Sequence, residues 1–139
     1  MILLDTHVVS EPLRAAPEAG VIAWIDAQPL ETLFLSAMTV AELRAGVALL
    51  PAGKRRSSLQ HSLEKQVLPL FAGRVLAFDM ACTSAYAELL AKARRAGVAI
   101  ATADACIAAV AATNTLAVAT RDASPFEAAG VAVINPWRS

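Results

Sequence analysis

The stretch Ile2-Leu3-Leu4-Asp5 decides the fold, because it is a short apolar run that stops at an acid. A run of this kind is typical of a strand that is buried on both faces of a parallel sheet. Short apolar runs recur at 33–36, 75–78, 116–119 and 131–134, and helical patterns separate them. Strands that alternate with helices predict an α/β fold with a mostly parallel sheet.

The helical segments follow from spacing and from helix end signals. We expect helical turns up to residue 13, a helix that begins at Pro17, and further helices at 39–50, 54–68, 79–95 and 102–113. Asp79 can cap its helix, and Gly97 follows the basic residues of its last turn. A last helix is expected to have Ser124 as its cap and to end at Gly130.

Composition limits the class of protein. A chain of 139 residues predicts one domain, 1–139. The content of 57% hydrophobic residues excludes a disordered chain. The zero net charge excludes a strongly basic protein that coats a polyanion. The run 105–112 is too short to cross a bilayer, and the first residues lack the pattern of a signal peptide. Cys82 and Cys106 have no metal-ligand spacing, so we expect both to be free thiols. Together with the missing signal peptide and membrane span, this predicts a cytoplasmic protein that does not bind a membrane.

Four acids are expected to meet at one edge of the sheet. Asp5 and Asp122 end apolar strands, and Glu42 and Asp104 are expected in first helical turns. The carboxyl ends of parallel strands and the following helix starts share one edge, where ligands bind. We call these four residues the acidic quartet.

Each acid also has a purely structural interpretation. Thr39 and Glu42 have the spacing of a capping box, and Asp104 could stabilise its helix start in the same way. Asp5 could be a turn acceptor, and Asp122 could cap the helix that follows it. Together, however, four like charges repel unless a cation occupies the site. Carboxylate oxygens suit Mg²⁺ or Mn²⁺, whereas Zn²⁺ prefers His or Cys.

The runs that carry these acids resemble those of PIN-domain proteins, especially the VapC-type toxins of bacterial toxin–antitoxin pairs. The matching motifs are Leu3-Leu4-Asp5-Thr6, Thr39-Val40-Ala41-Glu42-Leu43, Ala103-Asp104 with Ile107-Ala108, and Thr120-Arg121-Asp122 with Phe126 and Gly130. They occur in the family's order, and the resemblance extends to Trp137.

The resemblance implies a three-layer α/β/α sandwich and a divalent-cation-dependent endoribonuclease. It also implies a homodimer and a small antitoxin, which we expect to bind DNA. The acidic quartet corresponds to the family's catalytic acids. Bound Mg²⁺, or Mn²⁺ in its place, would activate a water and stabilise charge on the phosphodiester. We expect Asp5, Asp104 and Asp122 to hold the metal, with Glu42 orienting the attacking water.

Further residues are expected at the substrate or around the metal. Thr120 matches the family's hydroxyl residue, although it could instead cap a strand end, and Thr6 follows the first acid directly. His7 stands where the family usually has Asn, and we expect its protonated ring to compete with the metal. Arg121 could touch substrate or pair with an acid.

Other cations and the aromatic residues are weaker candidates. The run 54–56 and the pair 94–95 could bind an RNA backbone, but a solvated helix face is the better explanation. Arg14 and Arg44 lie near the expected cleft in sequence and could touch substrate or pair with an acid. Trp24 and Trp137 are expected in the core.

Of two rival functions, the sequence excludes one and leaves the other open. Receiver domains and aspartyl phosphatases need a lysine at a late strand end, and the three lysines here all fall in expected helices. A non-catalytic PIN-like module could instead dimerise a DNA-binding antitoxin. The apolar surplus favours a homodimer in either case, because a soluble monomer rarely exposes large apolar patches.

Overall fold

Five parallel strands form the central sheet of the computed structural model, which describes residues 1–138. The strands are β1 (Ile2–Leu4), β2 (Leu33–Ser36), β3 (Val75–Leu76), β4 (Ala117–Ala119) and β5 (Val133–Ile134). Their order in the sheet is β3-β2-β1-β4-β5, and each neighbouring pair is parallel. The predicted α/β class is confirmed.

Seven α-helices connect the strands within these residues: α1 (Thr6–Ser10), α2 (Ala19–Ala27), α3 (Ala37–Ala48), α4 (Lys54–His61), α5 (Met80–Arg95), α6 (Thr102–Thr113) and α7 (Ala123–Ala128). Asp79 caps α5 by accepting a hydrogen bond from the Cys82 N–H at 3.2 Å, as predicted. The helix expected at 54–68 instead changes to π geometry at Ser62–Val67 and 3₁₀ geometry at Leu68–Phe71. Pro69 lacks the N–H that an α-helix would need there.

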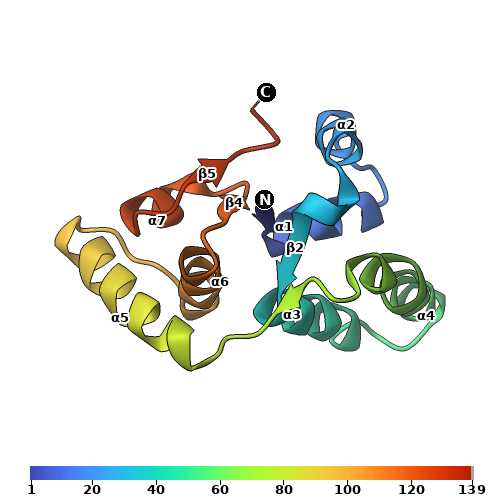
Figure 1. Cartoon of the computed structure of the whole chain (residues 1–139). Coiled ribbons are helices and arrows are strands. Elements are labelled where there is room, and N and C mark those ends of the chain that lie inside the picture. Colours follow the sequence, from blue (N-terminus) through green and yellow to red (C-terminus); the bar gives the residue numbers. More distant parts are fainter. Residues whose placement is uncertain (139) are drawn as a thin grey trace.

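The helices cover both faces of the sheet, which gives the predicted three layers (Figure 1). Helices α5, α6 and α7 lie on one side, and α1 and α2 lie on the other. The alternation of side chains along the strands divides the core accordingly. Leu3 and Val118 join the cluster with α5, α6 and α7, whereas Leu4 and Ala119 join the cluster with α1 and α3.

The chain order places a ligand-binding position beside β1. From β1 the chain proceeds to β2 on one side, and it later returns to β4 on the other side. The Asp5 N–H donates to the carbonyl oxygen of Ala119 at 2.9 Å, directly beyond the two strand ends. Open parallel sheets bind ligands where the strand order reverses in this way. Asp5 and Thr120 therefore lie at the switch point.

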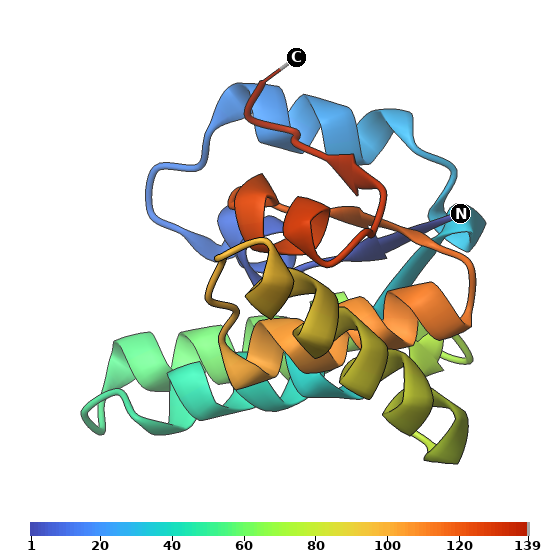
Figure 2. The same ribbon diagram turned by 90° about the vertical axis from the view of Figure 1, so that its left-hand side faces the viewer.

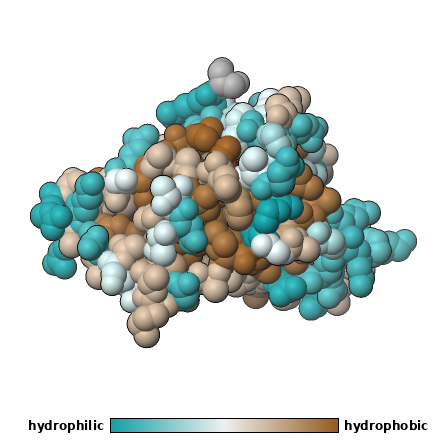
Figure 3. Space-filling model, in the orientation of Figure 1, coloured by the Kyte–Doolittle hydropathy of each residue, from teal (hydrophilic) through white to brown (hydrophobic). Residues whose placement is uncertain are grey.

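Two surface features distinguish the rest of the molecule. Helices α3 and α4 run side by side as an arm that extends beyond the sheet (Figure 2). Apolar residues gather over α6 and α7 in the middle of the face shown in Figure 3, whereas the α4 end is hydrophilic. Within residues 1–138, no helix combines the length and apolar character needed to cross a membrane.

The turn after α7 depends on a glycine. Gly130 has φ +84°, and a Cβ atom there would lie 2.5 Å from Lys92 Nζ. We expect Gly130→Ala to lower the free energy of unfolding by about 1–2 kcal/mol through backbone strain, with a further ~0.5 kcal/mol from displacing Lys92 beside the end of α7.

Gly97→Ala is the matched control, because Gly97 also has a positive φ (+71°) but has open space where the Cβ would lie. Urea unfolding of both variants separates backbone strain from the Lys92 contact. Equal losses would contradict a role for Lys92.

Candidate active site

Asp5 is the buried centre of the candidate site. It follows β1 directly, and only 4% of its surface is exposed. Its Oδ1 accepts a hydrogen bond from the Thr6 N–H at 2.7 Å, and its Oδ2 accepts one from the Thr120 hydroxyl at 2.8 Å. Burial raises the pKa of Asp5, and these hydrogen bonds oppose the rise. Both carboxylate oxygens are therefore held in fixed positions.

Glu42 joins the same network through Thr6. The Thr6 hydroxyl donates to Glu42 Oε1 at 2.7 Å and lies 3.3 Å from the Thr39 hydroxyl. The expected capping box is wrong: Ser36 caps α3 by accepting from the Thr39 N–H at 3.0 Å, so α3 begins at Ala37. Glu42 consequently lies in the second turn, and its oxygen bonds a side chain instead of the helix start.

Asp122 is connected to Asp5 through Thr120. The Thr120 hydroxyl, which donates to Asp5, also accepts a hydrogen bond from the Asp122 N–H at 3.2 Å. The predicted start of the last helix is also wrong, because α7 begins at Ala123 and Asp122 occupies the cap position in place of Ser124. The Asp122 side chain forms no capping hydrogen bond and is exposed, so its carboxylate is available for other ligands.

Asp104 joins the other acids through charge. It lies in the first turn of α6, as predicted, and is half-buried. Burial raises the pKa of Asp104, and the charges of Asp5, Glu42 and Asp122 raise it further. The other three acids therefore act on Asp104 through charge, and among the described residues no side-chain hydrogen bond joins it to them.

His7 lies at the exposed edge of this field. It is on α1, and its charge lowers the pKa of both Asp5 and Asp104. His7 is thus close enough to both acids for its charge to affect their ionisation. Its predicted competition with a metal stays a prediction.

The donor set fits a hard divalent cation that keeps part of its water. Carboxylate and hydroxyl oxygens line the site, and a cation would relieve the repulsion between Asp104 and the other acids. Within the described residues, no three acidic, His or Cys side chains converge into a complete metal-binding cluster. Mg²⁺ needs no such cage, because it commonly binds through one or two carboxylates and several waters.

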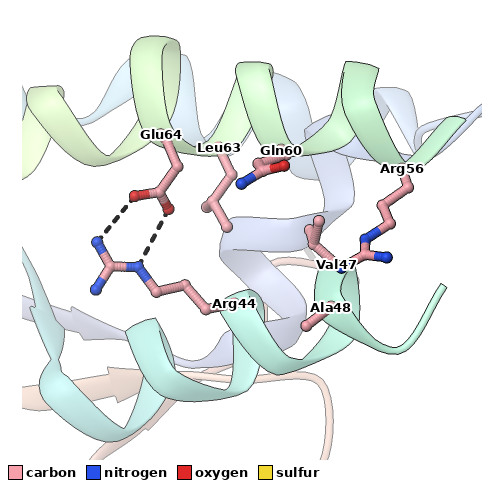
Figure 4. A pocket seen from close by; sticks show the side chains of 7 residues that line it. All are labelled: Arg44, Val47, Ala48, Arg56, Gln60, Leu63 and Glu64. Atoms are coloured by element: carbon pink, nitrogen blue, oxygen red, sulfur yellow. Dashed lines mark hydrogen bonds and ion pairs between the residues drawn. The ribbon is translucent and has the colours of Figure 1, made fainter. Parts of the chain in front are cut away.

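Two of the candidate arginines are occupied elsewhere. Arg14 pairs with the buried Glu11 at 2.8 Å, and Arg44 pairs with Glu64 at 2.9 Å. The Arg44–Glu64 pair closes one end of a pocket of about 280 Å³ between α3 and α4 (Figure 4). Lys54 and Arg55 are exposed on α4, as a solvated helix face would have them.

Sequence reasoning missed two supports of the site. Ser36 fixes the start of α3, and Asn135 Nδ2 donates to the Arg121 carbonyl at 3.2 Å, which holds the loop that carries Thr120 and Asp122. The strand-end serine before an apolar helix was a usable cap signal. The Asn135 contact joins residues 14 positions apart, so local spacing could not reveal it.

Comparison with known proteins shows the family of this chain. The PIN domain family model matches residues 2–131. The chain is 67% identical over 139 residues to the plasmid stability protein StbB of Pseudomonas syringae pv. tomato, with both chains covered completely. It is 58% identical over 137 residues to the VapC ribonuclease Y4jK of Sinorhizobium fredii and 55% identical over 137 residues to the toxin FitB of Neisseria gonorrhoeae, covering at least 98% of each protein.

Solved structures agree with this assignment. The crystal structure of FitAcB from Neisseria gonorrhoeae matches with a TM-score of 0.96 and 54% identity over 100% of both chains. The structure of FitAB bound to an IR36 DNA fragment matches with a TM-score of 0.97 and 52% identity, covering 100% of this chain and 97% of that one. The resemblance drawn from the acidic motifs is confirmed at the level of fold and family.

Proposed function

The chain belongs to the PIN-domain family, and from that premise we propose that it is a toxin that hydrolyses RNA phosphodiester bonds with the help of a divalent metal. The observation that carries the proposal is the hydrogen-bond chain from Glu42 through Thr6 to Asp5, and from Asp5 through Thr120 to Asp122. A relative that is 58% identical and is named a VapC ribonuclease supports the choice of RNA.

In this proposal Asp5, Asp104 and Asp122 would hold Mg²⁺ directly or through its water molecules, and Mn²⁺ could substitute for it. Such an ion would activate a water and stabilise charge on the oxygens of the phosphodiester. Thr120 and Thr6 fix the two oxygens of Asp5 and favour its ionised form, since their hydrogen bonds oppose the rise in its pKa that burial causes. Glu42, held by the Thr6 hydroxyl, orients the attacking water and accepts its proton.

We also propose a small antitoxin as partner, itself able to bind DNA, and a homodimer. The support is the structure of FitAB bound to a DNA fragment, in which the matching chain is 52% identical to this one. Exposed apolar residues near the β3 edge (Leu70, Val75, Phe78 and Met80) support an interface between copies. We place the activity in the cytoplasm, where its RNA substrate would be.

The test is a cleavage assay with the purified full chain. RNA and single-stranded DNA are incubated with Mg²⁺, with Mn²⁺ and with EDTA. We expect metal-dependent cleavage of RNA. Cleavage that persists in EDTA would overturn the metal role, and an RNA that stays intact with either metal would favour the non-catalytic dimerising module.

Thr120→Val tests the two hydrogen bonds of the Thr120 hydroxyl, because valine has almost the same side-chain volume as threonine. The valine cannot donate to Asp5 or accept from Asp122, so the pKa of Asp5 should rise further and the metal should bind less well. We expect RNA cleavage to fall by about tenfold or more at neutral pH, and by a larger factor as the pH decreases.

Thr120→Ser is the matched control, because it keeps the hydroxyl. Rates of both variants are measured across pH. A Thr120→Val profile that coincides with that of Thr120→Ser would show that the hydroxyl does not support Asp5.

A further inference from the structure

Arg121 lies within the active-site loop and stacks on an aromatic ring. It is the residue between Thr120 and Asp122, and its Cζ lies 5.3 Å from the centroid of the Trp137 ring. The Trp137 N–H donates to Asn135 Oδ1 at 2.9 Å, and Asn135 Nδ2 donates to the Arg121 carbonyl at 3.2 Å. The segment 135–137 therefore holds both the backbone and the side chain of Arg121.

The charge of Arg121 is left available by this arrangement. Arg14 and Arg44 are each paired with a glutamate, whereas within residues 1–138 no acid pairs with Arg121. Its partner is a neutral ring, which attracts the cation without neutralising it. The guanidinium is exposed, so its N–H donors remain free to bind an anion.

Trp137 is a rigid support for this stack. It is half-buried and packs against the apolar cluster that contains Leu4 and Val8, next to the buried Pro136. A ring fixed by the core limits the rotamers of the arginine that covers it. The sequence pattern predicted only a core role for Trp137, but the structure also gives it a functional neighbour.

We propose that Arg121 binds a backbone phosphate of the RNA substrate beside the acidic quartet, and that Trp137 is the positioning residue that holds it there. The proposal rests on the proposed ribonuclease function. Four carboxylates repel a nucleic-acid strand, so a fixed cation in their own loop would favour its approach. Arginine suits this position because its planar donors match two phosphate oxygens.

RNA affinity tests the first half. Binding of a short unstructured RNA is followed by fluorescence anisotropy with Mg²⁺ at several salt concentrations, in the Asp5→Asn background so that cleavage does not interfere. We expect Arg121→Gln to weaken binding by about tenfold. The slope of log affinity against log salt should fall by about 0.7, the value for one phosphate contact on a single strand. Arg121→Lys should keep the slope.

The matched control is Lys65→Gln, which removes one exposed positive charge from the Ser62–Val67 segment after α4. It should change neither affinity nor slope appreciably. If Arg121→Gln behaves like Lys65→Gln while the wild-type chain cleaves RNA, the phosphate role is wrong and the ribonuclease function stands. If the wild-type chain cleaves no RNA, the proposed function itself fails.

A double-mutant cycle tests the second half. Trp137→Leu removes the π face and should weaken RNA binding by about threefold when Arg121 is present. In the Arg121→Gln chain the same substitution should not weaken RNA binding any further. Trp137→Phe keeps an aromatic face and should restore most of the loss; thermal unfolding confirms that each variant is folded. The same loss from Trp137→Leu in both backgrounds would show that Trp137 does not act through Arg121.

Discussion

Asp5→Asn is expected to reduce RNA cleavage by about a thousandfold, because it removes a metal-ligand charge at the centre of the hydrogen-bond network. Both Asp5 oxygens are acceptors, at 2.7 Å from the Thr6 nitrogen and 2.8 Å from the Thr120 hydroxyl oxygen. An asparagine amide group cannot accept in place of the second oxygen. The amide can instead donate to the Thr120 hydroxyl oxygen, so the variant should lose metal affinity while retaining its fold.

Asp26→Asn is the matched control, since Asp26 is exposed on α2 and belongs to none of these contacts. Cleavage rates and circular dichroism are compared for the wild-type chain and both variants, purified in parallel. Wild-type cleavage by Asp5→Asn would remove Asp5 from the mechanism, and loss of cleavage in Asp26→Asn would point to a non-specific cause.

The strand-end acids could be predicted from sequence because their position follows from a simple rule. A buried parallel strand is a short apolar run, so the residue after it lies at the carboxyl edge. Asp5 and Thr120 conform to this rule, and the register Leu4–Ala119 brings them together. The first-turn position of Asp104 followed equally well from its neighbours.

The contacts between elements could not be predicted in the same way. Ser36 and Thr39 are both reasonable caps by local chemistry, and the choice between them depends on where β2 ends in the sheet. The stacking of Arg121 on Trp137 depends on the path of the chain after β5. Sequence spacing identified Arg121 but left its partner undecided between substrate and acid.

The acidic quartet makes the metal-free protein less stable than its fold alone would be. Asp104 has no side-chain hydrogen bond among the described residues, and burial and three neighbouring carboxylates raise its pKa. A carboxyl group whose pKa is raised by folding binds protons more readily in the folded chain than in the unfolded chain. As the pH rises from the ordinary value of 3.8 through the raised pKa, this group therefore reduces stability.

Asp104→Asn should consequently stabilise the metal-free protein while it removes activity. At about pH 7.5 we expect the melting temperature in EDTA to increase by about 2–4 °C, because a neutral amide replaces an ionised carboxylate in a repulsive field. The gain should shrink as the pH approaches 3.8, where Asp104 is protonated in the wild-type chain. RNA cleavage should fall by about a hundredfold or more with the loss of a metal ligand.

Added metal should reverse the order of the two proteins. A cation that binds only the folded chain stabilises it by mass action, and the wild-type site should bind more tightly than one that has lost Asp104. Saturating Mg²⁺ is therefore expected to raise the melting temperature of the wild-type chain more than that of Asp104→Asn. Differential scanning fluorimetry with EDTA and with Mg²⁺ measures both effects. Two results would contradict the idea that the metal relieves repulsion between the acids. One is an Asp104→Asn chain that melts below wild type in EDTA at neutral pH. The other is an Asp104→Asn chain whose melting temperature rises with Mg²⁺ as much as that of wild type.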